Sequence, residues 1–290
     1  MIIKHSAQEE LTERDRIFGQ EYLLGHSELE IKRLQRQADI LEPITKRLFH
    51  EAGIVPGMRI LDVGCGAGVS FLAGCLVGNL GSVIGVDANP AVLEIARARA
   101  KSAFIPNVAF IESPVEAFYD EKSFDAVVGR LFLIHQAAPE KTLSHVISLL
   151  RPGGIVAFHE LRPSNDNFQS LPPAPLWDQV GKWILTTVLN NAPHREVGGR
   201  LVKLFLDCGL MTPRVFYEGV VDYGSESQLY ALQADLVRTL MPHMVRLGVA
   251  TVDEIDIDSL QTRLTEQVAE NQSQIVWAGH FCGSAKKPSE

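Results

Sequence analysis

The sequence predicts an α/β protein in which helices cover both faces of a mostly parallel β-sheet. Short apolar runs alternate with helical segments between residues 58 and 159, and a glycine-rich loop follows the first run. The 290 residues are 46% hydrophobic and 21% charged, a globular composition that argues against disorder. A chain of this length buries about three quarters of its unfolded surface, so it needs no disulfide or metal for stability.

The predicted elements follow one another along the chain in a regular order. The charged, Leu-rich and Ile-rich stretch 6–49 is expected to be helical, with a kink or break at Pro43. Strands are expected at 58–63, 82–86, 108–112, 125–129, 155–159, 213–221 and 274–282. Helices are expected at 69–78, 91–101, 139–150, 176–189, 199–208, 226–248 and 256–269. The domains expected are an N-terminal helical cap (1–50), a core (51–221 and 274–290) and a helical lid insertion (222–273).

Charge and cysteine content restrict the classes of partner. The chain has 27 Lys and Arg against 35 Asp and Glu, a net charge of -8, which argues against nucleic-acid and anionic-membrane partners. No segment has the pattern of a signal peptide or a membrane span, so we expect a cytoplasmic protein. The sequence leaves a homodimer open. Four scattered cysteines indicate neither a metal site nor a disulfide scaffold: Cys65, Cys75, Cys208 and Cys282.

The run LDVGCGAG, residues 61–68, joins a predicted strand to a predicted helix. Glycines in such a loop adopt backbone angles that side chains forbid, and they let a ligand approach the main chain at the carboxyl end of the strand. Asp62 stands just before the loop, where its carboxylate can accept hydrogen bonds from a ligand ammonium group. The loop therefore predicts a binding site for a cationic or zwitterionic group.

Asp87 ends the second predicted strand, and an acidic group at that point can accept hydrogen bonds from both hydroxyls of a ribose. The ligand should therefore contain a nucleoside. A dinucleotide would need a G-x-G-x-x-G loop for its pyrophosphate, whereas this loop is G-x-G-x-G and Asp62 would repel phosphate. The predicted ligand is S-adenosyl-L-methionine, which carries an amino-acid tail and no phosphate.

With these motifs, residues 58–159 resemble the class I, Rossmann-like, S-adenosylmethionine-dependent methyltransferases. Four motifs carry the resemblance: LDVGCGAG (61–68), GVDAN (85–89), SFDAVVGR (123–130) and LRPGG (150–154). EYLLGHS (21–27) and VWAGHF (276–281) more loosely resemble a bacterial branch that acts on small molecules. The resemblance implies a Rossmann-like seven-stranded sheet whose last strand is antiparallel, with N-terminal helices and a helical insertion before the last strand as a lid.

The resemblance also implies which residues contact the cofactor. They are assigned to the methionine part (Gly64, Cys65, Gly66, Gly68), the ribose (Asp87, with Ala88 beside it), the adenine (Val115, Glu116) and the surroundings of the sulfonium (Gly129, Arg130). Tyr22 either closes over the methionine end or packs within a helix. Many relatives place an Asp after the third strand to bind adenine. Here residues 112–116 read ESPVE, so the backbone at Val115 or the Ser113 hydroxyl would take that part.

Three residues near the ends of the fourth and fifth predicted strands are candidates for a catalytic base. His135 follows the fourth strand, and the pKa of an imidazole suits proton transfer near neutral pH. His159 and Glu160 end the fifth strand and are expected to face the same cleft. The alternatives are that His135 caps the next helix and that His159 and Glu160 bond to a neighbouring loop. His280 in the last strand is expected to be a core residue.

The predicted function is transfer of a methyl group from S-adenosyl-L-methionine to O, N or C of a small-molecule acceptor by in-line displacement, leaving S-adenosyl-L-homocysteine. One alternative is a protein that binds S-adenosylmethionine without methyl transfer, either a sensor or a sulfonium-assisted enzyme. A less favoured alternative is an NAD(P)-dependent oxidoreductase, against which the G-x-G-x-G spacing and Asp62 both argue.

Overall fold

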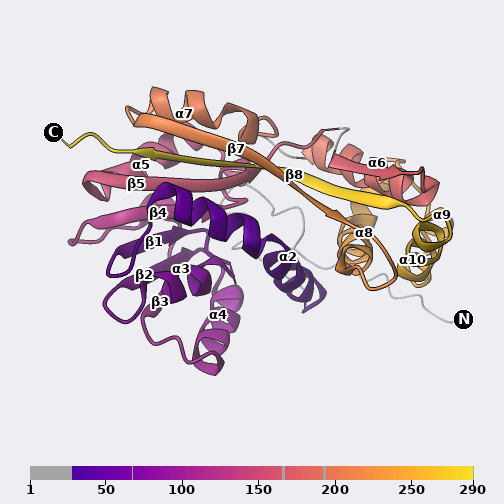
Figure 1. Cartoon of the computed structure of the whole chain (residues 1–290), viewed down its shortest axis with the longest axis horizontal. Coiled ribbons are helices and arrows are strands. Elements are labelled where there is room, and N and C mark those ends of the chain that lie inside the picture. Colours follow the sequence, from indigo (N-terminus) through magenta and orange to yellow (C-terminus); the bar gives the residue numbers. More distant parts are fainter. Residues whose placement is uncertain (1–27, 67, 165–166, 192–193, 290) are drawn as a thin grey trace, which may run out of the picture.

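A computed structural model of the chain describes residues 28–66, 68–164, 167–191 and 194–289, with the backbone alone for 28–31 (Figure 1). The strands are β1 (Arg59–Val63), β2 (Ser82–Asp87), β3 (Val108–Glu112), β4 (Phe124–Arg130), β5 (Leu150–Leu161), β6 (Phe168–Leu171), β7 (Met211–Asp222) and β8 (Gln274–Lys286). The α-helices are α2 (Glu28–Ala52), α3 (Val69–Val77), α4 (Pro90–Ser102), α5 (Pro139–Ser148), α6 (Pro175–Asn191), α7 (Leu201–Asp207), α8 (Gln228–Arg246), α9 (Val252–Ile255) and α10 (Leu260–Glu270). Short 3-10 helices are η1 (Val115–Ala117), η2 (Leu133–His135) and η4 (Gly198–Arg200). Tyr22 lies outside the described residues.

The sheet has the predicted mostly parallel, Rossmann-like arrangement, with eight strands instead of the expected seven. Its order is β3-β2-β1-β4-β5-β8-β6, and β7 pairs with β8. The first five strands are parallel, and β8 is antiparallel to β5, as the family resemblance implies. The additional strand, β6, lies in a stretch rich in Pro, Ser and Asn that carries no alternating pattern. It forms because β8 extends beyond the end of β5 and offers Gln274 to Trp277 as a free edge.

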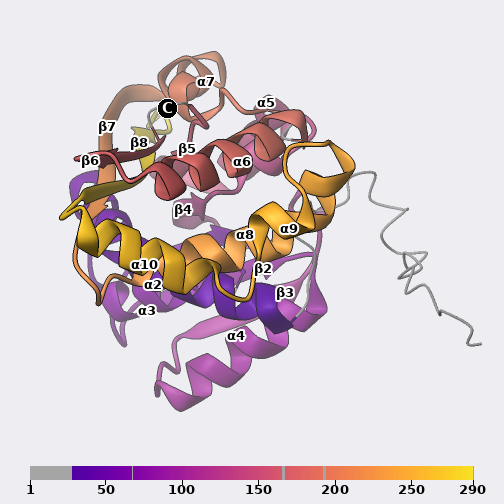
Figure 2. The ribbon, with the colours of Figure 1, turned by 90° about the vertical axis from the view of Figure 1, so that its right-hand side faces the viewer.

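The long β7–β8 pair connects two parts of the molecule. Its register runs from Met211 opposite Lys286 to Asp222 opposite Ile275, so it continues well past β5. We call β1–β5 with α3–α5 and α7 the Rossmann lobe, and β6 with α6, α8, α9 and α10 the helical lobe (Figure 1). Figure 2 faces the helical lobe, in which α6, α8 and α10 pack together. This lobe therefore contains β6 and α6 in addition to the predicted insertion.

The helix α2 packs against both lobes. It contacts α3, β5 and β8, and it also lies along α8. The helix runs on through Pro43, so the predicted break at this residue is wrong. Its buried face explains the continuity, because apolar contacts on both sides of the proline hold the turns in place: Leu41, Ile44, Leu48 and Phe49 are all buried.

Two irregularities in the sheet alter the predicted strand boundaries. The Arg151-Pro152-Gly153-Gly154 stretch, which separates the expected helix 139–150 from the expected strand 155–159, lies inside β5, where the register against β4 shifts between Phe124 and Ala126. In β8, Gly219 of β7 pairs with Gly279 and Val220 pairs with Trp277, which leaves Ala278 as an extra residue with φ 33°. This is a β-bulge, a feature that bends a strand and increases its twist.

Candidate active site

The glycine loop after β1 combines a closely packed end and an open end. Gly64 and Gly66 have φ of 60° and 52°, in the left-handed region that favours glycine. A Cβ on Gly64 would lie 2.3 Å from the ring of Phe132, whereas a Cβ on Gly66 would have no atom within 4 Å. The loop is therefore fixed from one side by an aromatic ring and leaves free space above Gly66 for a ligand.

Asp87 connects the loop to the end of β2. Its Oδ2 accepts a hydrogen bond from the Gly66 N–H at 3.0 Å, and its Oδ1 accepts one from the Asn89 N–H at 2.9 Å. The carboxylate is half-buried, and Ala88 beside it is exposed. The carboxylate is thus oriented by the backbone on both oxygens before any ligand binds.

Asp62 lies fully buried beneath the loop. Its Oδ2 accepts a hydrogen bond from the Ser70 hydroxyl at 2.6 Å, and its Oδ1 has no partner among the described residues. Burial raises the pKa of Asp62 to about 7, and the positive charge of Arg130 opposes that rise. An unsatisfied carboxylate oxygen beneath the glycine loop has the charge and lone pairs to accept a hydrogen bond from the ammonium group of an amino-acid tail.

Arg130, the last residue of β4, lies between the loop and α2. Its guanidinium donates long hydrogen bonds of 3.4 Å to the Ala38 carbonyl and the Thr45 hydroxyl. A Cβ on Gly68 would lie 3.0 Å from its Nη2, so glycine leaves room for this side chain. Desolvation lowers the pKa of Arg130 to about 10, and the side chain stays charged at neutral pH beside Asp62.

The adenine candidates lie on and beside η1. Val115 is buried, while Glu116 is exposed and its Oε1 accepts a hydrogen bond from the Thr142 hydroxyl at 2.9 Å. The Ser113 hydroxyl donates to the Pro114 carbonyl at 2.8 Å, and the Ser113 N–H donates to the Asp87 carbonyl at 3.1 Å. Because its hydroxyl proton is engaged locally, Ser113 is less suited than the Val115 backbone to hold the ring. Cys65 is buried within the loop, and burial raises the pKa of its thiol.

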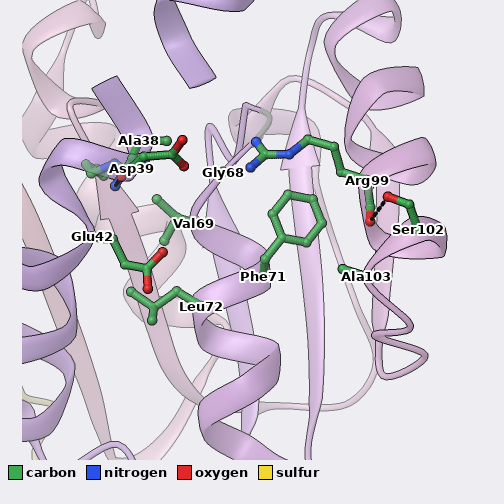
Figure 3. A pocket seen from close by; sticks show the side chains of 11 residues that line it. Ala38, Asp39, Glu42, Gly68, Val69, Phe71, Leu72, Arg99, Ser102 and Ala103 are labelled. Carbon is green, nitrogen blue, oxygen red and sulfur yellow. Dashed lines mark hydrogen bonds between the residues drawn. The ribbon is translucent and has the colours of Figure 1, made fainter. Parts of the chain in front are cut away.

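A cavity of about 200 Å³ opens beside the loop, between α2, α3 and α4 (Figure 3). Asp39 and Glu42 of α2 line one side, and Arg99 and Phe71 line the other. The cavity shares Gly68 and Arg130 with the cofactor site described above. It therefore adjoins residues predicted to lie near the methionine part and the sulfonium, and Asp87 is not among its lining residues.

The comparisons with known proteins agree with this geometry, and the chain belongs to the class I S-adenosylmethionine-dependent methyltransferases, in the small-molecule branch. A family model described as a methyltransferase domain matches residues 54–187. S-adenosyl-L-methionine is the cofactor and S-adenosyl-L-homocysteine the product. The open space over Gly66 and the unsatisfied oxygen of Asp62 fit its amino-acid tail.

Relatives cover more than half of the chain. An aklanonic acid methyltransferase of Streptomyces is 31% identical over 171 residues, covering 58% of this chain and 74% of the relative. A ubiquinone biosynthesis O-methyltransferase of Paracidovorax citrulli is 36% identical over 190 residues, covering 63% of this chain and 75% of the relative. The YcgJ protein of Bacillus subtilis superposes with a TM-score of 0.51 at 16% identity, covering 84% of this chain and 99% of that one, and shares the fold.

Of the three residues predicted as bases, His135 has an exposed side chain. It ends η2, directly after the turn that follows β4. Surrounding protein desolvates the ring, and together with the positive charge of Arg33 on α2 it lowers the pKa of His135 to about 4. The imidazole is therefore neutral at pH 7.

His159 and Glu160 were expected to face one cleft, but they point to opposite faces of the sheet because consecutive strand residues alternate. His159 contacts the Thr45 hydroxyl of α2, with 2.9 Å between Nδ1 and Oγ1. Glu160 accepts hydrogen bonds on Oε1 from the backbone N–H groups of Phe132 and Leu133, at 3.0 and 2.7 Å. Both side chains are fully buried, and burial raises the pKa of Glu160 to about 7.

Sequence reasoning missed three residues that shape the site: Phe132 over Gly64, Thr45 on His159, and Arg33 near His135. Each acts across a long separation in sequence, and none belongs to a recognisable motif. The helical spacing of Thr45 with Ala38 and Leu41 was the available signal, because it places a polar side chain on the buried face of α2.

Proposed function

We propose that this enzyme methylates an oxygen atom of a small organic acceptor, with His135 accepting the proton. The single observation that carries the proposal is that His135 is an exposed, neutral imidazole one short turn beyond the end of β4. A hydroxyl nucleophile must lose its proton as the methyl group is transferred, so a neutral base near the sulfonium assists the reaction. The relative named as an O-methyltransferase supports oxygen as the acceptor atom.

In this proposal the chain's own residues hold the cofactor. Asp62 takes the ammonium group, Asp87 takes the ribose hydroxyls, and the backbone near Val115 with Glu116 adjoins the adenine. Gly64, Gly66 and Gly68 admit the methionine part, and Gly129 and Arg130 lie beside the sulfonium. In-line displacement then requires that the acceptor and the methyl group are aligned and that water is excluded. The buried side chains of Phe132 and Leu133 favour the exclusion of water.

His159 and Glu160 serve as supports in this proposal because solvent does not reach them. Glu160 fixes the start of η2, which carries His135 at its end. Desolvation and the nearby Arg33 both disfavour the imidazolium, so His135 gives up the accepted proton readily.

The proposal is tested with S-adenosyl-[methyl-³H]methionine and a panel of catechols, phenolic acids, aromatic amines and β-diketones. Label should enter the oxygen acceptors. Mild alkali then separates aryl ethers, which keep the label, from methyl esters, which release it as methanol. Transfer confined to amines or to carbon would contradict the proposal. The Asp87→Ala variant provides the background rate.

The proposal extends to organisation and location. The core (51–221 and 274–290) and the insertion (222–273) are compatible with α8, α9 and α10 lying between β7 and β8. All four cysteines are free thiols, as a reducing cytoplasm would keep them. No helix in the described part of the chain is long and apolar enough to cross a bilayer. A homodimer stays a prediction that light scattering can test.

A further inference from the structure

Three buried aromatic rings meet where the two lobes join. His159 of β5 and His280 of β8 make an edge-to-face contact with ring centroids 4.7 Å apart, and Trp277 of β8 lies 5.7 Å from His280. His280 is opposite Leu161, where β5 ends, and Trp277 is opposite Phe168, where β6 begins. All three rings are at most 4% exposed. We call them the junction cluster.

The hydrogen bonds of Thr45 fix the protonation of His159. We assign the single proton of the Thr45 hydroxyl to the Leu41 carbonyl at 3.1 Å, so that the hydroxyl accepts from His159 Nδ1 at 2.9 Å. The proton of His159 therefore sits on Nδ1, and Nε2 carries a bare lone pair. Burial and nearby charge lower the pKa of both histidines, that of His280 to about 3, so both rings are neutral.

The junction cluster contains polar atoms that the described residues do not satisfy. His159 Nε2, both ring nitrogens of His280 and Trp277 Nε1 have no hydrogen-bond partner among them. Buried polar groups are almost always paired in folded proteins, because an unpaired one pays the full cost of its desolvation. Several such atoms in three contacting rings therefore indicate a partner that is not part of the described chain.

We propose that the junction cluster is the polar end of the acceptor site and binds a hydroxyl group of the acceptor. His159 Nε2 can only accept a hydrogen bond, and the Trp277 N–H can only donate one. A hydroxyl group meets both demands at once, and its second lone pair can accept a hydrogen bond from the N–H of the neutral His280 ring. A carboxylate cannot donate to Nε2, and an ammonium group cannot accept from Trp277 and would be repelled by Arg130. This inference rests on the proposed function, since it names a group that the methyl acceptor must carry.

The apolar surroundings make such a contact selective. Leu41, Ile275 and Cys282 belong to the same buried core, so a ligand without the hydroxyl leaves the polar atoms unpaired and gains nothing in exchange. The cluster also adjoins Arg130, whose register partner in β5 is His159. A hydroxyl held here thus lies in the part of the sheet that carries the proposed sulfonium neighbour.

The first test uses two probes of the same shape, p-cresol and p-xylene, which differ by a hydroxyl in place of a methyl group. With the protein saturated with S-adenosylhomocysteine, calorimetry should give about tenfold tighter binding of p-cresol. Long-range ¹H–¹⁵N spectra of the histidines should show a shift of His159 Nε2 with p-cresol. Equal affinity for the two probes, or unchanged histidine signals, would overturn the inference and leave buried water as the partner.

The second test is His280→Phe, which keeps an aromatic ring and removes two unpaired nitrogens. Thermal stability should hold or rise, because unsatisfied polar atoms are lost from the core, while p-cresol binding weakens about tenfold. Affinity for S-adenosylhomocysteine should not change. His145→Phe on α5 is the matched control, and its p-cresol affinity should stay at the wild-type value. Unchanged p-cresol affinity in His280→Phe would assign the cluster to packing alone.

These measurements need no methyl transfer, so they separate the two proposals. If label never enters an oxygen acceptor while p-cresol still contacts His159, the proposed function fails and the site stands. If O-methylation occurs and neither probe contacts the cluster, the site fails alone. Should His280→Phe not fold, Trp277→Phe removes the N–H donor and is read by the same two measurements.

Discussion

Asp87 at the cofactor end and the ring nitrogens at the lobe junction differ in how the chain satisfies them. At the cofactor end, backbone N–H groups of Gly66 and Asn89 hold both oxygens of Asp87, so the chain organises this side chain by itself. At the junction, buried nitrogens of His159, His280 and Trp277 have no partner among the described residues. In the two proposals, the chain orients the ribose-binding carboxylate before the cofactor binds, whereas the acceptor completes the hydrogen bonds at the junction.

The largest expected effect is the loss of cofactor affinity in Asp87→Ala. Asp87→Ala removes two charge-assisted contacts to the ribose and also releases the Gly66 N–H, so cofactor binding should weaken by about 4 kcal/mol, roughly a thousandfold. Calorimetry with S-adenosylhomocysteine measures this. Glu112→Ala is the matched control, since Glu112 is the exposed register partner of Asp87 on β3. A change below threefold for Asp87→Ala would refute the ribose assignment.

His135→Gln tests whether His135 is the general base in methyl transfer. Loss of a general base should lower kcat about a hundredfold while affinity for S-adenosylhomocysteine stays within twofold. Steady-state kinetics with the best acceptor of the panel and calorimetry report the two quantities separately. His194→Gln, on a half-buried histidine that contacts the Ala137 carbonyl, is the control. If kcat does not change, alignment alone drives methyl transfer and the base assignment is wrong.

Two glycine substitutions sharpen the comparison within the loop itself. Both Gly64 and Gly66 have positive φ, but a Cβ would meet Phe132 at Gly64 alone. Gly66→Ala should therefore lower the free energy of unfolding by about 1 kcal/mol from backbone strain, and Gly64→Ala by about 3 kcal/mol because overpacking is added. Urea denaturation compares the pair. Equal losses would mean that the ring of Phe132 moves aside freely.

The pH dependence of cofactor binding tests Asp62. Its folded-state pKa of about 7 lies above the usual 3.8, so the folded protein keeps a proton that the unfolded chain releases. This group therefore lowers stability as pH rises from about 4 to 7, and its ionised form binds an ammonium group above that range. Affinity for S-adenosylhomocysteine should fall about tenfold from pH 8 to pH 6, as the ionised fraction of Asp62 falls. The same titration of Asp62→Asn should be flat, and a parallel slope would remove Asp62 from the site.

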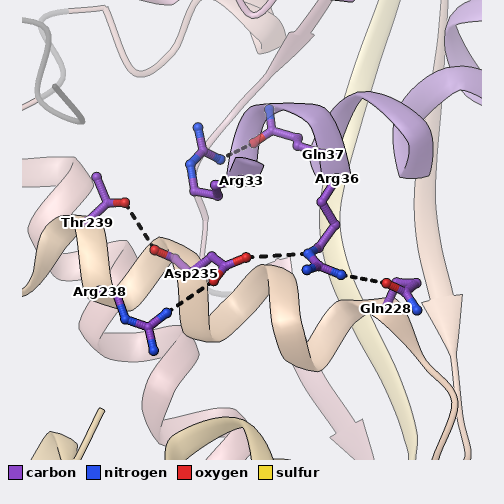
Figure 4. A network of polar contacts seen from close by, with 7 residues as sticks. All are labelled: Arg33, Arg36, Gln37, Gln228, Asp235, Arg238 and Thr239. Carbon is purple, nitrogen blue, oxygen red and sulfur yellow. Dashed lines mark hydrogen bonds and ion pairs between the residues drawn. The ribbon is translucent and has the colours of Figure 1, made fainter. Parts of the chain in front are cut away.

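The smallest effect concerns the contact between α2 and the helical lobe. Arg36 of α2 donates to Gln228 and pairs with Asp235 of α8 at 3.4 Å, and Arg238 shares Asp235 (Figure 4). A double-mutant cycle on Arg36 and Asp235 should give a coupling energy of about 0.5 kcal/mol, because the pair is partly exposed. A coupling above 2 kcal/mol would show that this contact holds the lobes together.

The sequence predicted the Rossmann lobe more fully than the junction, for a physical reason. Strand ends and glycine loops are local patterns, so β3 was placed at its observed bounds and Asp87 at the tip of β2. The strand β6 carries no pattern of its own and depends on the free edge of β8. Glu160 was expected in a cleft, but it binds backbone N–H groups 27 and 28 residues away, a contact that no local spacing encodes.

The bulge at Ala278 has a consequence for what the last strand can present. In an unbroken strand, residues 277 and 280 are separated by an odd count and would point to opposite sides. Because Ala278 is left out of the pairing, Trp277 and His280 oppose Val220 and Glu218, which are two residues apart on β7. The indole and the imidazole therefore lie on the same side of the strand. If Ala278 instead took part in regular pairing with β7, Trp277 and His280 would face opposite sides, so the bulge decides which rings meet there.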